Sequence, residues 1–245
     1  MSISKYLVMR KTFYFLFSLT IALFASAQEP LLTPQQMPNP IHFLPPPPDT
    51  ASAAFAYDQA QYHWGKQQRQ DSLRAAIAFC DANWRIEYIC QIFSQPFGIE
   101  LSKENTPAIY ELLYVGLITN DGVGRLPKDY YRRTRPFVYY GESSLVPEDE
   151  EELRNNGSYP SGHTIEGWSA ALLLSELNPE RADTILARGY MYGQSRVIAG
   201  YHWQSDVDAG YMAASAGIAR LHADKRFQRL LKKAKREYAC KSRRR

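Results

Sequence analysis

The amino-acid sequence predicts a single compact all-α domain of about eight to ten helices, and three observations support this fold class. Apolar residues recur at intervals of three and four along most of the chain, which is the rhythm of helices. The alternation typical of strands is scarce, and we find neither an internal repeat nor a Gly-rich phosphate loop. With 245 residues, 45% of them apolar, the chain is long enough to bury one sizeable core.

The N-terminus, residues 1–27, has the pattern of a secretory signal peptide. Lys5, Arg10 and Lys11 precede an apolar run of about 13 residues, which Ala25-Ser26-Ala27 closes. The alternative is a membrane anchor, but the run is shorter than the roughly 18 to 20 residues that span a bilayer. We therefore expect cleavage after Ala27 and export, into the periplasm if the source is a bacterium with an outer membrane.

Cleavage there changes the charge of the protein. It removes three cations and no acid, so the formal net charge falls from +4 to +1. A chain so close to neutral does not favour nucleic acid as a partner. No later run is long and apolar enough to span a bilayer, so we expect a soluble mature protein with no membrane segment.

The mature chain is expected to begin with a proline-rich arm, residues 28–49, that acts as a spacer or as a strap over the domain, with polyproline II at Pro45–Pro48. Residues 50–245 are expected to form the helical domain. Asp49 or Thr50 can cap its first helix. The next helical stretch, residues 70–98, is expected to be interrupted and to end at Pro96–Gly98.

The later helices follow the same reasoning. Ser102 or Thr106 can cap a helix that has Pro107 in its first turn. Residues 178–201 and 204–239 also show helical periodicity.

The three cysteines, Cys80, Cys90 and Cys240, leave at least one thiol unpaired within the chain. On one unbroken helix Cys80 and Cys90 would lie about 15 Å apart, beyond disulfide reach. A bridge would require a break near residues 81–83. Three cysteines are too few to staple the fold, so the core must stabilise it.

Residues that can carry chemistry gather in three short segments, of which the first is residues 126–137. Pro127 is expected to open a short helix with Lys128 in its first turn. Pro136 biases Arg135 away from helical backbone, so the Arg135 side chain can reach across a cavity. Taken alone, these charges are more typical of a solvated surface.

The second segment is residues 156–174. Ser158 or Ser161 can cap the helix that follows, and Gly162 lets the backbone come close to a ligand. The free N–H groups of a helix start favour an anion, and His163 stands at that entrance. The alternative is a capped helix with a surface histidine.

The third segment, residues 195–210, carries Arg196, His202 and Asp206. If Asp206 lies in the first turn of a helix, its carboxylate can reach back to His202 and fix the imidazole tautomer. Arg196 can offer a bidentate fork to an oxyanion. A structural histidine paired with Asp206 is the alternative.

Together the segments resemble the tripartite signature of the phosphatidic acid phosphatase type 2 superfamily, which includes vanadium haloperoxidases. The signature reads Lys128, six residues, Arg135-Pro136; then Pro160-Ser161-Gly162-His163; then Ser195-Arg196, five residues, His202, three residues, Asp206. The stretches LPPPP, GSYPSGHT, ILARGY, GQSRVI and GYHWQSDVDAG further resemble class A bacterial non-specific acid phosphatases. This likeness covers nearly the whole chain after the signal.

The resemblance implies a role for each residue of the signature. His202 would be the nucleophile that forms a phosphohistidine, Asp206 would orient it, and His163 would be the general acid. The phosphate would be held by Lys128, Arg135, Arg196, Ser161 and the Gly162 backbone.

The resemblance also implies an all-helical, exported enzyme that needs no metal or other cofactor and hydrolyses small phosphomonoesters such as nucleotides, sugar phosphates and aryl phosphates. Vanadate would mimic the phosphoryl transition state. Transfer of phosphate to alcohols would be a side activity, and a homo-oligomer is suggested. We expect a pH optimum of about 5 to 6.5, on the low side of free imidazole.

Three other functions would use the same phosphate-binding residues. A vanadium haloperoxidase would use the same cradle but is usually much larger, and a lipid phosphatase of this superfamily would carry several membrane spans. A phosphate-binding module without catalysis is disfavoured because His163 and His202 are both present.

The chain departs from the class A pattern at Ala199, where a disulfide-forming cysteine is common. Tyr159 and Trp203 flank site residues and are expected to line the mouth of the site.

Overall fold

The computed structural model describes residues 29–243, and the expected signal peptide lies outside the described residues. The described chain contains helices and no strands. Nine helices have nine residues or more (α2–α6 and α9–α12) and two have five (α7 and α8), which confirms the expected fold class. Their bounds are α2 Ala53–Gln68, α3 Ser72–Cys80, α4 Ile86–Phe97, α5 Pro107–Asn120, α6 Gly122–Tyr131, α7 Pro136–Tyr140, α8 Glu150–Arg154, α9 Gly162–Leu177, α10 Ala182–Ile198, α11 Gln204–His222 and α12 Lys225–Ser242.

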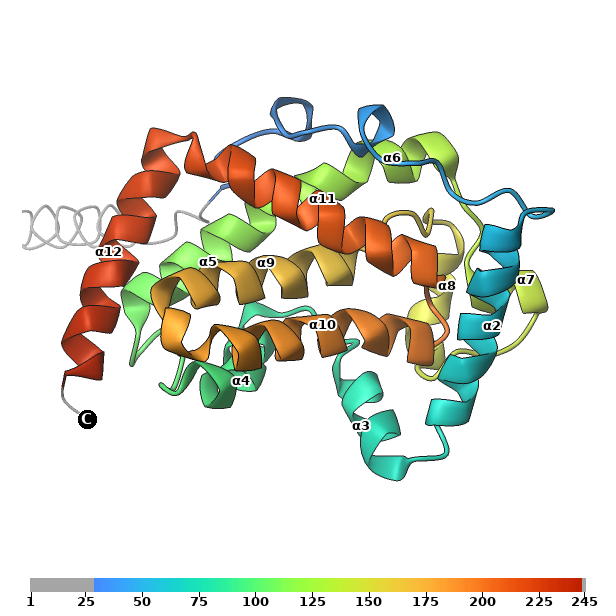
Figure 1. Cartoon of the computed structure of the whole chain (residues 1–245), viewed down its shortest axis with the longest axis horizontal. Coiled ribbons are helices and arrows are strands. Elements are labelled where there is room, and N and C mark those ends of the chain that lie inside the picture. The colour runs from blue at the N-terminus through green and yellow to red at the C-terminus, as the bar shows by residue number, and fades with distance from the viewer. Residues whose placement is uncertain (1–28, 244–245) are drawn as a thin grey trace, which may run out of the picture.

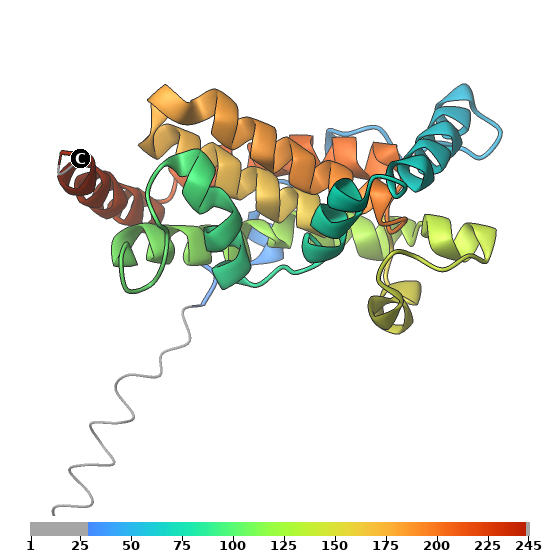
Figure 2. The ribbon, with the colours of Figure 1, turned by 90° about the horizontal axis from the view of Figure 1, so that it is seen from below.

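The long helix α9 lies at the centre of the molecule and packs against α5, α10 and α11 (Figure 1). Buried residues occur on every face of this helix, so it has no side that is fully open to solvent. Helix α12 closes one end of the elongated molecule and α2 and α7 lie at the other (Figures 1 and 2). The core includes Leu112 of α5, Leu173 of α9, Ile185 of α10 and Phe227 of α12, all fully buried.

Small residues bring the central helices close together. A Cβ built on Gly167 of α9 would collide with the ring of Tyr192 on α10. A Cβ on Gly217 of α11 would collide with the side chain of Asn120 on α5. Glycine is therefore needed at both positions for the helices to approach.

The N-terminal arm lies over the domain as a strap. It contains 3-10 helices η1 (Pro34–Gln36) and η2 (Pro40–His42), and Leu32, Met37 and Leu44 are buried in the core. At the far end of the arm the Tyr159 hydroxyl donates to the Pro45 carbonyl at 2.7 Å. The arm is thus part of the packed domain and not a free spacer.

Local signals in the sequence placed several helix ends correctly. The stretch 70–98 is interrupted after Cys80 and ends at Gly98, whose left-handed φ of 84° suits glycine. Thr106 occupies the N-cap position of α5 with Pro107 next to it, as expected. The first cap is a correction, because Ser52 and neither Asp49 nor Thr50 caps α2 through the Phe55 N–H.

A second correction concerns Pro127. We expected it to open a helix, but it lies inside α6, and Lys128 is in the last turn and not the first. The helix begins earlier because the chain continues from the end of α5 into Gly122 after a single turn residue, Asp121.

The three cysteines are all free thiols. The break at residues 81–83 that a bridge would need is present, yet Cys80 is exposed and Cys90 is buried. Among the described residues no helix is long and apolar enough to cross a membrane.

The remaining 3-10 helices connect the longer elements. They are η3 (Pro147–Asp149), which leads into α8, and η4 (Pro179–Arg181), which leads into α10.

Candidate active site

The three segments singled out in the sequence meet at one cavity of about 460 Å³. Six of the eight expected site residues line it. They are Lys128, Arg135, Gly162, His163, Arg196 and His202. The other two, Ser161 and Asp206, are fully buried behind the cavity wall.

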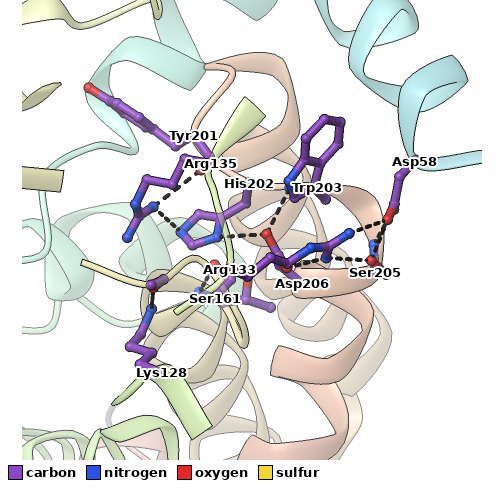
Figure 3. Close-up of polar contacts among 12 residues, drawn as sticks. Asp58, Lys128, Arg133, Arg135, Ser161, Tyr201, His202, Trp203, Ser205 and Asp206 are labelled. Atoms are coloured by element: carbon purple, nitrogen blue, oxygen red, sulfur yellow. Dashed lines mark hydrogen bonds and ion pairs between the residues drawn. The ribbon is translucent and has the colours of Figure 1, made fainter. Parts of the chain in front are cut away.

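His202 lies in the loop between α10 and α11, and Asp206 is in the first turn of α11, as the spacing predicted. The Asp206 carboxylate accepts the Trp203 backbone N–H at 2.9 Å, which anchors it at the helix start. Its Oδ2 is 3.4 Å from His202 Nδ1, an ion-pair distance that lacks hydrogen-bond geometry (Figure 3).

The other ring nitrogen of His202 reveals its tautomer. Nε2 lies 3.0 Å from Nη1 of Arg135. Because a guanidinium only donates, a neutral His202 must accept through Nε2 and carry its proton on Nδ1, which faces Asp206. The lone pair of Nε2 is therefore held at the cation cluster of the cavity.

Arg133 is a site residue that our sequence analysis missed. Its Nη1 donates to Asp206 Oδ1 at 2.5 Å and its Nη2 donates to Asp58 Oδ2 at 2.7 Å. Asp58 also accepts from the Ser205 backbone N–H at 2.8 Å. Arg133 thus ties α2 to the start of α11 and fixes the carboxylate behind His202 (Figure 3).

Three cations converge on the cavity. Arg135 is 2% exposed and is held by the carbonyls of Leu153, Asn156 and Tyr201 at 2.9, 3.1 and 3.2 Å. Lys128 Nζ donates to the Gly157 carbonyl at 3.0 Å.

Arg196 is fully buried and lies over the Tyr201 ring at 4.5 Å, and its Nε and Nη1 have no hydrogen-bond partner. Unsatisfied buried donors are rare, so these two N–H groups mark a place for an acceptor.

Burial lowers the pKa of all three cations, and repulsion by a neighbouring cation adds to this for Lys128 and Arg135. Burial, followed by the charge of Arg135, lowers the pKa of Lys128 to about 7. Burial lowers the pKa of Arg135 to about 10 and that of Arg196 below its ordinary value. A bound anion would offset this repulsion and raise the pKa of each cation again. The cavity is therefore suited to binding a negatively charged group.

Helix α9 begins at the cavity with Ser161 as its N-cap. The Ser161 hydroxyl accepts from the Thr164 hydroxyl at 2.9 Å, which leaves its own proton free to donate. Gly162 is the first residue of the helix, so its N–H has no partner within the helix. A Cβ there would extend toward Asp121 and Lys128, both of which line the cavity.

His163 Nε2 lies 2.9 Å from the Ala82 carbonyl, which can only accept. Nε2 therefore carries a proton, and Nδ1 is the nitrogen that can gain and release another. Burial, followed by the charge of Arg196, holds the pKa of His163 well below 6.5. Burial, followed by the charge of Arg135, does the same to the pKa of His202.

Our expectation for the mouth of the site was wrong. Tyr159 and Trp203 are 3% and 1% exposed and do not line the cavity, because Trp203 packs against Phe55 and donates its indole N–H to the Thr134 carbonyl. The lining of the cavity instead includes Trp84 and Glu166. No spacing rule identified either residue, although an acid one turn after His163 can be read from the sequence.

Comparison with known proteins agrees with this geometry. The PAP2 superfamily profile matches residues 109–229, which hold all eight expected site residues and all three segments. The chain is 46% identical to a non-specific acid phosphatase of Providencia stuartii, over 80% of this chain and 79% of the relative. The chain belongs to the PAP2 superfamily.

Two further relatives span more of the chain. A non-specific acid phosphatase of Salmonella typhimurium is 42% identical over 96% of this chain and 92% of its own length. An acid phosphatase of Zymomonas mobilis is 37% identical over 90% of this chain and 83% of its own length. These similarities place the chain with the bacterial acid phosphatases of the PAP2 superfamily, as the resemblance of its motifs predicted.

Proposed function

We propose that this acid phosphatase hydrolyses a broad range of small phosphate monoesters through a covalent phosphohistidine on His202, without a metal ion. The observation that carries the proposal is the Nε2 lone pair of His202, which faces a cluster of three cations, two of them buried. A nucleophile placed beside preorganised positive charge suits phosphoryl transfer, in which catalysis is mostly positioning and electrostatic stabilisation.

In the proposed complex the phosphoryl oxygens are bound by Lys128, Arg135 and Arg196, and the unsatisfied N–H groups of Arg196 gain acceptors. The Gly162 N–H and the Ser161 hydroxyl complete the cradle at the start of α9. Phosphate draws Arg135 away from Nε2 of His202, which frees the lone pair for attack.

In the first step Nε2 of His202 forms a bond to phosphorus while the bond between phosphorus and the leaving oxygen breaks. His163 gives the proton on Nδ1 to that oxygen, so the product leaves as a neutral alcohol. His202 becomes positively charged, and the Asp206 carboxylate beside Nδ1 stabilises this charge.

In the second step water attacks phosphorus, the bond to Nε2 breaks, and the now neutral His163 takes the proton of the water. Phosphate then leaves and the enzyme returns to its first state. An alcohol in place of water would give phosphotransfer, which we propose as a side activity.

The pH dependence follows from the charges in the cavity. The cations keep the pKa of both histidines low in the free enzyme, which suits His202 as a nucleophile but opposes His163 as an acid. The negative charge of bound substrate offsets the cations and raises the pKa of His163. We therefore keep the proposed optimum of about pH 5 to 6.5, and a rate maximum above pH 8 would contradict it.

The cellular setting is part of the same proposal. The residues before Gln28 fit a cleaved signal, so the enzyme would act after export to the periplasm on nucleotides, sugar phosphates and aryl phosphates. Its partner would be a second copy of itself, in keeping with the apolar content of the chain.

The test uses residues 28–245 and p-nitrophenyl phosphate at pH 6 with excess EDTA. We expect turnover by the wild type, none by His202→Ala, and wild-type rates for His222→Ala, a surface histidine paired with Glu176. Activity that EDTA abolishes would refute metal independence. If the wild type binds phosphate but does not turn over, adding vanadate, peroxide and bromide tests the haloperoxidase reaction.

A further inference from the structure

A second pocket, of about 280 Å³, adjoins the catalytic cavity. It lies between the start of α4, the middle of α5 and α9, three helices that pack together (Figure 1). Trp84 and Glu166 line both spaces, so the two are adjacent. Their volumes together fall within the roughly 300 to 1,000 Å³ of sites for small molecules.

The walls of this second pocket are mostly apolar. They consist of Trp84, Ile86, Tyr110, Tyr114, Leu117 and Ile118, with Arg85 and Glu87 at the rim. The Tyr110 hydroxyl is already engaged, since it donates to Glu87 at 2.9 Å. Trp84 is 65% exposed, and an exposed tryptophan beside a cavity is typical of a binding surface. The catalytic cavity differs from this pocket because it is lined mainly by charged groups.

Glu166 stands where the two pockets join. It lies one turn after His163 on α9, and its Oε2 is buried without a hydrogen-bond partner. Burial, followed by the negative charge of Asp121, raises the pKa of Glu166 to about 8, against the opposing charge of Arg196. At acid pH the carboxyl is therefore protonated, so it offers an O–H donor and adds no negative charge beside the phosphate.

The charged and titratable groups that line the two pockets come from every neighbouring element. They are Arg85 and Glu87 at α4, Tyr110, Tyr114 and Asp121 at α5, Arg125 and Lys128 of α6, Arg135 before α7, Glu152 of α8, His163 of α9, Arg196 of α10 and His202. Among these, Asp121 and Arg196 act on Glu166 most directly.

We propose that this second pocket binds the leaving group of the substrate, that the leaving group carries a flat aromatic ring that stacks on Trp84, and that Glu166 donates a hydrogen bond to it. The inference rests on the proposed function, because it takes the phosphoryl group to lie in the adjoining cavity. The ring can be attached directly to the phosphate oxygen, as in an aryl phosphate, or through a sugar, as in a nucleotide.

The first experiment compares KM and kcat at pH 5.5 for phenyl phosphate, adenosine 5′-monophosphate and glycerol 2-phosphate, which has no ring. We expect Trp84→Ala to raise KM about tenfold for at least one ring-bearing substrate, because it removes the stacking of the ring on an aromatic side chain. KM for glycerol 2-phosphate and all kcat values should change less than about twofold. Tyr57→Ala, at an aromatic residue that is 55% exposed on α2, is the matched control.

The two ring-bearing substrates distinguish the sources of the ring. A loss confined to phenyl phosphate places the ring directly on the phosphate oxygen, and a loss confined to the nucleotide places it beyond a sugar. The proposal is overturned if Trp84→Ala changes KM equally for all three substrates or for none of them.

Glu166→Gln tests the donor, because the amide still donates but does not ionise. At pH 5.5 its KM for the ring-bearing substrate should match the wild type. Between pH 7 and 9 the wild-type KM should rise relative to that of the variant, as Glu166 ionises beside the phosphate. A ratio that stays constant with pH would refute the role of Glu166.

A separate experiment distinguishes failure of the proposed function from failure of the proposed pocket. If the wild type does not hydrolyse even glycerol 2-phosphate, the enzymatic proposal fails but the pocket can still be tested. Calorimetry then compares phenylphosphonate with methylphosphonate, neither of which has a scissile P–O–C bond. Tighter binding of the phenyl compound that Trp84→Ala removes would support the pocket, and equal binding of the two would overturn it.

Discussion

Replacing Arg133 with methionine should lower both the stability and the activity of the enzyme. The Arg133 side chain is 8% exposed, and its two carboxylate partners, Asp58 and Asp206, are 1% and 0% exposed. Methionine keeps most of the length of the side chain but leaves both carboxylates buried without their cation. Each then loses a charge-assisted hydrogen bond that water cannot replace.

The expected loss of stability can be estimated from this burial. Breaking a buried ion pair by removing one partner costs about 3–5 kcal/mol. For a domain of this size each kcal/mol lowers Tm by about 2–4 °C, so Tm should fall by roughly 6–20 °C. The Asp206 carboxylate keeps only its bond from the Trp203 N–H, so His202 is less firmly placed and kcat should fall by about 10- to 100-fold.

Thermal unfolding and steady-state kinetics measure the two effects. Arg133→Lys should be intermediate, because one ammonium cannot bridge both carboxylates as a guanidinium fork does. The matched control is Lys233→Met, which removes an ion pair to Glu111 in which the lysine side chain is 63% exposed; it should change stability by less than about 1 kcal/mol. If Arg133→Met unfolds within 2 °C of the wild type with unchanged kcat, the bridge does not hold the site together.

Three further predictions follow from other parts of the structure. Gly167→Ala should destabilise the protein by about 1–3 kcal/mol in urea unfolding, because the new Cβ meets the Tyr192 ring; an unchanged midpoint would show that α9 and α10 are not closely packed. Phosphate binding at pH 8 should take up about one proton more in the wild type than in Lys128→Met, because the pKa of Lys128 is about 7 in the free enzyme and rises beside the anion; below pH 6 the difference should vanish, and calorimetry in buffers of different ionisation enthalpy measures it. A thiol reagent should label two cysteines in the native protein and the buried Cys90 only after denaturation, and rapid labelling of all three would contradict its burial.

Helices could be predicted from the sequence because their signals are local. Pro107 at the start of α5 and Gly98 at the end of α4 act within one turn of the chain, and the structure places both as expected. The prediction that Pro127 begins a helix was wrong for the same reason. A proline in the first turn and a proline inside a helix look alike until the preceding residues are known to be helical.

The residues of the site could be predicted because their spacing is also local. His202 and Asp206 are four apart, and a helix start between them brings the carboxylate back to the imidazole. The sequence could not predict that Arg133 supports this pair, since its other partner, Asp58, is 75 residues away and carries no motif. It also suggested the wrong aromatic residues for the mouth, because adjacency in sequence to His202 does not tell whether Trp203 faces the cavity or the core.

The sequence by itself determined the helical class, several helix ends and most of the expected side chains that line the cavity, because these depend on interactions between residues a few positions apart. Only the tertiary structure decided how those side chains are held. It placed the proton of His202 on Nδ1 through Arg135, gathered three repelling cations around one cavity, and opened an aromatic pocket beside it. These features arise where helices distant in sequence meet. Burial at those contacts lowers the pKa of the cations, and the packing of the helices determines the shape of the two pockets.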